Sequence, residues 1–126
     1  MRIQSILLTM TLVSSAAIVP NAAAHHAFGA FFDPSTTVVI SGKVTEFHFI
    51  NPHAYILVNV TNDAGEQASW QLESTSVGQL FREGLTPQTL HPGDNISAIG
   101  NPARDGRNLM RLLTITMPDG EQKKLQ

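Results

Sequence analysis

The pattern of residues 38–49 constrains the fold more than any other feature of the sequence, because it describes one long and bent strand. Apolar residues alternate with polar ones from Val38 to Val44, which is typical of a strand with one buried face. Gly42 stands in phase with the apolar positions and predicts a bend or bulge. The alternation shifts near Glu46, and Asn51-Pro52 then ends the strand, because proline cannot donate to a sheet ladder.

The rest of the chain adds four more strands and one short helix. The expected elements are strands at 53–60, 67–73, 95–100 and 109–117, a helix at 76–84 between the third and fourth strands, and a frayed tail. Trp70 and Leu72 are expected inside, and Leu80 and Phe81 on the apolar face of the helix. This order predicts an all-β fold with one short helix, as a small OB-like five-stranded Greek-key barrel. A small sandwich or another barrel also fits the pattern.

The N-terminus has the composition of a secretory signal peptide. Arg2 is the one charged residue in the first 24, a short apolar run follows at 6–13, and Ala22 and Ala24 form an Ala-x-Ala site. The run is too short to span a bilayer, so no membrane span is expected after cleavage. We therefore predict a signal peptide at 1–24, an N-terminal segment packed on the barrel at 25–37, and the barrel domain at 38–126, in a periplasmic or secreted protein.

Composition excludes several classes of function. Removal of residues 1–24 leaves 102 of the 126 residues, enough for one small domain, with seven basic and ten acidic residues. This excess of acidic residues is a poor match for nucleic acid. Cysteine is absent, so there is no disulfide, thiolate metal site or cysteine nucleophile. No hydrolase, phosphate-binding or dinucleotide motif is found, so a catalytic role has no support from motifs.

The adjacent pair His25-His26 is the best candidate for metal chemistry. Cleavage after Ala24 would leave a free α-amine on His25, and this amine and the His25 imidazole can chelate one metal ion. A second imidazole, from His26, His48 or His53, would complete a nitrogen-rich set of the kind that favours Cu(II) or Ni(II), with Cu(II) bound most tightly. Cleavage one residue earlier also produces a chelating terminus. The alternative is a polar leader with only adventitious affinity for metals.

Other residues define the surroundings of this candidate site. His53 follows Pro52 and shares a strand face with Tyr55, which we take as a ligand-binding face. His48 has the opposite strand parity from His53 unless the Asn51-Pro52 break rotates the chain, and it is therefore the weaker ligand. Asp33 is a turn residue that could also orient an imidazole. The three phenylalanines of the N-terminal segment are expected to dock on the barrel, because exposing each ring costs roughly 1.5–3 kcal/mol. They are Phe28, Phe31 and Phe32.

Several motifs together resemble those of a known family. They are HHAF at 25–28, FFD at 31–33, GKVTEF at 42–47, NPHAYI at 51–56, W-x-L-E at 70–73, PGD at 92–94 and NPARDG at 101–106. The chain resembles a family of short exported bacterial proteins that carry only a domain-of-unknown-function label. The resemblance implies an exported small β domain and supplies no function.

The sequence thus favours a periplasmic barrel that binds a divalent transition metal, copper first, through His25, His26 and His53, in carriage, buffering or sensing. A second hypothesis is a binding module without metal, which holds a peptide, glycan or envelope protein on the face around Tyr55. A third is a copper enzyme, which no catalytic motif supports.

Overall fold

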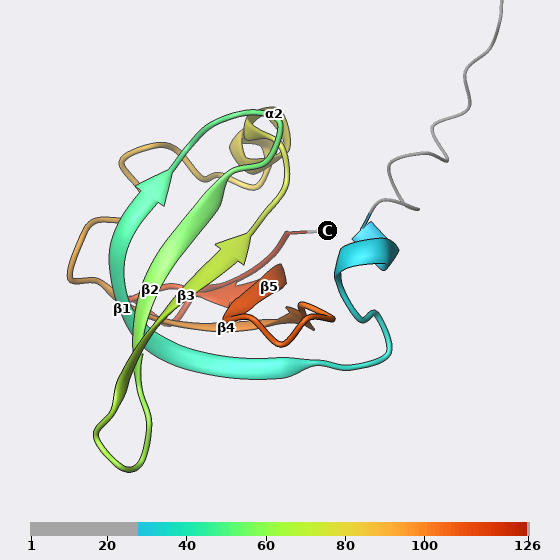
Figure 1. Cartoon of the computed structure of the whole chain (residues 1–126). Helices are drawn as coiled ribbons and strands as arrows, with labels where there is room; N and C mark the ends of the chain where they lie inside the picture. The colour runs from blue at the N-terminus through green and yellow to red at the C-terminus, as the bar shows by residue number, and fades with distance from the viewer. Residues whose placement is uncertain (1–27, 126) are drawn as a thin grey trace, which may run out of the picture.

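The chain folds into a closed five-stranded β-barrel with one short helix, shown in Figure 1 as a computed structural model that describes residues 28–125. The elements are β1 (Val38–His48), β2 (Tyr55–Thr61), β3 (Gln67–Glu73), α2 (Val77–Arg82), β4 (Asn95–Pro102), β5 (Leu109–Thr116) and β6 (Gln122–Lys124). The OB-like Greek-key barrel predicted from the sequence is confirmed.

The long first strand lets the sheet close on itself. Residues 38–43 of β1 pair with β4, and residues 43–48 pair with β2, so one strand borders both halves of the barrel. The order β3-β2-β1-β4-β5 is closed by a short parallel pairing of residues 71–73 in β3 with 109–111 in β5. This closing seam is where the N-terminal segment lies (Figure 1).

The bend predicted in β1 is confirmed. The register of β1 against β2 shifts between Val44 and Glu46, as expected for a bulge. Gly42, just before the bulge, has no room for a side chain, since a Cβ atom there would collide with the backbone carbonyl of Asn59. Glycine at this position therefore lets β1 approach β2 closely where the strand coils.

The core fills the inside of the barrel with alternate residues of each strand. On β2, Ile56 and Val58 are buried while Tyr55 is only half-buried on the outer face, as the alternation predicts. Leu72 of β3 is also fully buried. Trp70 is not: it packs against the core but stays half-buried, so the prediction of a buried Trp70 is wrong. It lies on the part of β3 that precedes the seam with β5.

Helix α2 is short and covers one end of the barrel (Figure 1). The Ser76 side chain accepts a hydrogen bond from the backbone N–H of Gln79, which satisfies one of the free donors of the first turn. Leu80 is buried, whereas Phe81 is 53% exposed and contacts Phe49 edge-on.

The strand ends differ slightly from the sequence prediction. β1 ends at His48, β2 begins at Tyr55, and β4 runs on to Pro102. The expected frayed tail instead contains β6, which pairs with residues 114–116 of β5. The cause is visible in Leu125, which is 3% exposed and anchors the end of the described chain in the core.

Candidate functional site

One polar row crosses four strands on the outer face of the barrel. His48 of β1 is paired with Tyr55 of β2, Tyr55 with Glu73 of β3, and Glu73 with Arg111 of β5. Their side chains point outward because the residues beside them in sequence, such as Leu72, fill the barrel interior. We call these four residues the cross-strand row. All four are half-buried, so their polar groups lie at the surface but not in bulk water.

His53 meets this row at Glu73. Its Nδ1 lies 2.9 Å from Glu73 Oε1, and the two side chains are 41% and 24% exposed. The backbone holds the pair together, because the N–H of Ala54 donates to Thr75 and the N–H of Ser74 donates to Ala54. A neutral imidazole that donates through Nδ1 keeps its lone pair on Nε2. Nδ1 of His53 faces the Glu73 carboxylate, so Nε2 is the ring nitrogen that could bind a metal ion.

A helical turn of aromatic residues packs over this pair. We call residues 28–32 the aromatic turn; its backbone closes with a hydrogen bond from the N–H of Phe32 to the carbonyl of Phe28. Phe32 is 4% exposed and forms a bridge with Ala103. The ring of Phe28 is half-buried, and its centroid lies 5.0 Å from that of His53. Phe31 is 64% exposed, so the prediction that it docks on the barrel is wrong.

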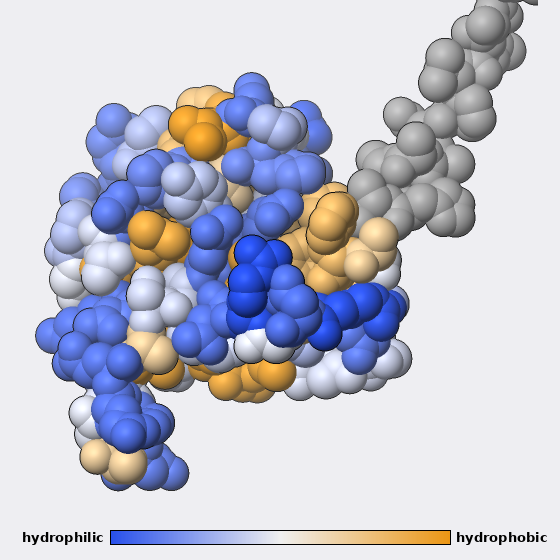
Figure 2. Space-filling model, viewed as in Figure 1, coloured by the Kyte–Doolittle hydropathy of each residue, from blue (hydrophilic) through white to orange (hydrophobic). Residues whose placement is uncertain are grey.

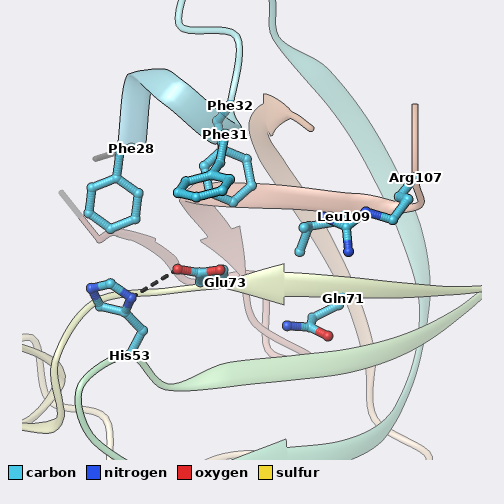
Figure 3. A pocket seen from close by; sticks show the side chains of 8 residues that line it. All are labelled: Phe28, Phe31, Phe32, His53, Gln71, Glu73, Arg107 and Leu109. Atoms are coloured by element: carbon cyan, nitrogen blue, oxygen red, sulfur yellow. Dashed lines mark ion pairs between the residues drawn. The ribbon is translucent and has the colours of Figure 1, made fainter. Parts of the chain in front are cut away.

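A cavity lies between the aromatic turn and β3 (Figure 3). Its volume is about 480 Å³, and its walls are Phe28, Phe31, Phe32, His53, Gln71, Glu73, Arg107 and Leu109. Figure 3 shows the three phenylalanine rings on one side, with Gln71 and the His53–Glu73 pair on the other. We call it the aromatic cavity. Figure 2 shows an apolar patch over the aromatic turn, with strongly hydrophilic side chains directly beside it.

Arg107 stands at the edge of the aromatic cavity and is held by its neighbour Asp105. Their Nε and Oδ2 atoms are 2.7 Å apart. The backbone N–H of Arg107 and then its guanidinium donate to Asp105 and lower the pKa of that carboxyl. The positive charge at this edge is therefore already matched by a carboxylate.

The side chain of His48 already contacts two other side chains, those of Tyr55 and Glu46. Its ring stacks on Tyr55, with centroids 4.3 Å apart and planes 13° apart, and its Nε2 is paired with Glu46. Within residues 28–125 no group of three or more His, Asp or Glu side chains is arranged to hold a metal ion. His48 and His53 thus share one face of the barrel but form no ligand set by themselves.

The remaining predicted site residues are placed as follows. His25 and His26 lie outside the described residues. Asp33 accepts hydrogen bonds from the backbone N–H and the hydroxyl of Ser35 and from the hydroxyl of Thr36. These bonds, the Ser35 hydroxyl first, lower the pKa of Asp33 to about 2. Both carboxylate oxygens serve the turn, and the carboxylate beside His53 is that of Glu73.

Sequence reasoning missed Glu73 and Arg111. Leu72 was expected inside, and strand alternation therefore places Glu73 outside, on the face of Tyr55. The position of Glu73 on the outer face could therefore have been predicted from strand alternation. The pairing of β3 with β5, which brings in Arg111, could not be inferred from spacing, because the two strands are separated by a helix and β4.

The sequence model of one protein family, described as "Family of unknown function (DUF6152)", matches residues 12–110. The chain belongs to this family. The resemblance to a domain-of-unknown-function family is thereby confirmed. No curated protein and no solved structure matches the chain.

Proposed function

We propose that this protein is an exported β-barrel that binds a divalent transition metal, copper first, through His25, His26 and His53. The role that follows is carriage, buffering or sensing of the metal. The observation that supports it best is the ion pair of His53 and Glu73, in which Nδ1 lies 2.9 Å from Oε1. Histidines that bind metals usually donate their second ring N–H to a carboxylate or carbonyl, which fixes the tautomer and turns the ring.

The position of Phe28 supports the participation of the two N-terminal histidines. Its ring centroid lies 5.0 Å from that of His53, and His26 and His25 precede it by two and three residues in the sequence. Covalent geometry limits the Cα of His26 to about 7 Å, and that of His25 to about 11 Å, from the Cα of Phe28. The proposal requires both imidazoles to bind a metal ion together with Nε2 of His53, and these chain lengths are compatible with it.

The proposed ligand atoms are all nitrogen, and this determines which metal ion the site should favour. An α-amine and three imidazoles supply only nitrogen, which suits Cu(II) or Ni(II) in a planar arrangement, and Cu(II) stands highest in the affinity order. The proposal requires export and cleavage after Ala24, because only then does His25 carry a free amine. No helix among residues 28–125 has both the length and the apolar character needed to cross a bilayer.

Native mass spectrometry of the exported protein tests this proposal. We expect a mass that corresponds to a chain beginning at His25, and one additional copper ion after incubation with Cu(II). Retention of residue 1, or a start beyond His26, would refute the chelate. A chain that begins at His25 but takes up no copper would refute the metal function itself.

The stack of His48 on Tyr55 favours a second candidate function. A half-buried aromatic pair on the outer face of a barrel offers a flat surface to a peptide, glycan or envelope protein. Cross-linking through a photoreactive residue at Tyr55, compared with one at Val39 on the β1–β4 side, would test it. Partner capture only from position 55 would support this binding face, and equal capture from both positions would refute it.

A further inference from the structure

A second cavity, of about 510 Å³, shares Phe28 and His53 with the aromatic cavity but has a different chemistry. Arg111, Ser74 and Ser76 supply polar groups to its wall, while Leu112 and Leu125 supply apolar surface. Among the described residues that line it, none is Asp or Glu. We call it the arginine cavity.

Arg111 gives this cavity a positive charge, and Glu73 stands opposite it on β3 outside the cavity wall. Its guanidinium carbon lies 4.4 Å from the centroid of the Phe28 ring, and within residues 28–125 it forms no ion pair. Stacking on a ring uses the flat face of the guanidinium and leaves the N–H groups at its edge free to donate. Because no carboxylate of residues 28–125 lies within ion-pair distance of this half-buried charge, the site favours an anion.

Ser74 adds a buried donor. The residue is 4% exposed, and its hydroxyl has no hydrogen-bond partner in the described chain. A buried hydroxyl without a partner costs free energy that a ligand can recover. Ser76 accepts a hydrogen bond at its Oγ, and its own hydroxyl proton remains available for donation.

We propose that the arginine cavity binds an aliphatic monocarboxylate, with the carboxylate on Arg111 and the Ser74 hydroxyl. The planar guanidinium matches a carboxylate through two parallel hydrogen bonds. One guanidinium balances one anionic charge, whereas a phosphate monoester carries nearly two. Leu112 and Leu125 face the aliphatic part of the ligand. This site does not depend on the proposed metal site, because none of its anion-binding groups is a proposed metal ligand.

Titration calorimetry and backbone amide NMR on the metal-free protein, in EDTA, test the proposal. Hexanoate is the probe, and hexanamide is its neutral control of nearly equal shape. We expect saturable binding of hexanoate, with amide shifts centred on residues 74–76, and binding of hexanamide weaker by at least about tenfold. Equal binding of the two would overturn the proposal.

Two variants separate the roles of the polar groups. Arg111→Gln should weaken hexanoate binding by at least about tenfold, whereas the matched control Arg107→Gln, in the aromatic cavity, should leave it unchanged. Ser74→Ala should weaken binding without lowering the free energy of unfolding, because the hydroxyl that is removed has no partner. A structural role for Ser74 predicts the reverse: lower stability with unchanged affinity. That result, or unchanged binding in both variants, would overturn the proposal.

Two further probes distinguish the source of the carboxylate. N-acetyl-leucine represents the C-terminus of a peptide, and hexanoate represents a free aliphatic acid. Whichever binds more tightly identifies the source, and each supports the site provided that its amide binds weakly. Binding of inorganic phosphate with no binding of either carboxylate would overturn it. All of these measurements are made without copper, so their failure leaves the metal proposal standing.

Discussion

The imidazole of His53 and the carboxylate of Glu73 meet on the outer face of the barrel, with Nδ1 and Oε1 2.9 Å apart. Two backbone hydrogen bonds hold the pair in place: the N–H of Ser74 donates to the carbonyl of Ala54, and the N–H of Ala54 donates to the carbonyl of Thr75. The geometry of the pair therefore belongs to the barrel and does not depend on the N-terminal histidines of the proposed metal site. The first prediction concerns the effect of the Glu73 carboxylate on Cu(II) affinity.

Glu73→Gln should weaken Cu(II) binding by about tenfold, because loss of an oriented carboxylate behind a histidine ligand typically lowers metal affinity by that much or more. The free energy of unfolding should change by less than about 1 kcal/mol, since the pair is partly exposed to water. Copper titration and urea denaturation provide the two measurements.

Glu46→Gln is the matched control for this variant. Glu46 also pairs with a histidine, but that histidine is His48, which is stacked on Tyr55. Copper affinity should not change in this control. Equal losses in both variants would indicate a general effect of surface charge and would contradict the role assigned to Glu73.

Gly100→Ala should destabilise the barrel by about 1–3 kcal/mol, as overpacking does. A Cβ atom at Gly100 would collide with the backbone carbonyl of Arg111, where β4 and β5 approach closely. Gly29→Ala in the aromatic turn should change stability by less than about 0.5 kcal/mol, because nothing lies within 4 Å of the added atom. Urea denaturation of both variants checks this contrast, and similar stabilities would contradict the close approach.

The sequence predicted the barrel because the alternation of apolar and polar residues identifies its strands. The bent strand could be located from Gly42 and the shift near Glu46, both of which depend on neighbours in sequence. Alternation alone did not predict correctly how far Trp70 is buried. Its parity with Leu72 is as expected. However, it lies on β3 just before the residues that pair with β5, and too little of the barrel covers its side chain there.

The candidate site could be predicted only where it depends on local sequence. His53 and Tyr55 were recognisable as one face from alternation alone. Arg111 was not, because its place beside Glu73 depends on the parallel pairing that closes the barrel. A pairing between strands far apart in the chain leaves no periodic signal in either strand. The sequence therefore indicated the histidines of the site and missed the charged residues that surround them.

Asp33 should titrate with a midpoint of about 2, well below its usual 3.8, when its carboxyl carbon is followed by NMR. A carboxyl with a pKa that is lower in the folded chain stabilises the fold above its unfolded pKa. That contribution is lost as the pH falls through its folded pKa. When the pH is lowered from about 5 to about 2, the melting temperature should accordingly fall less for Asp33→Asn than for the unchanged protein. A midpoint near 3.8 would show that the hydrogen bonds from Ser35 and Thr36 do not hold in solution.

The last prediction concerns cooperation between the N-terminal histidines and the barrel. If His25 and His26 bind copper together with His53, then His53→Ala should weaken Cu(II) binding by at least about tenfold, because one ligand from the folded domain is lost. One extra residue before His25 should also weaken it, since the amine leaves its chelate ring. Protons compete with copper for every nitrogen ligand, so affinity should fall as the pH is lowered.

A synthetic peptide of residues 25–33 provides the decisive control for this cooperation. It contains the amine, both N-terminal histidines and the aromatic turn, but it lacks the barrel and hence the His53–Glu73 pair. We expect copper titration to show at least about tenfold weaker binding for the peptide than for the protein, matching the loss in His53→Ala. If the protein, the His53→Ala variant and the peptide bind copper equally, the histidines act as an independent leader. The outer face around Tyr55 would then become the better candidate for the function of the barrel.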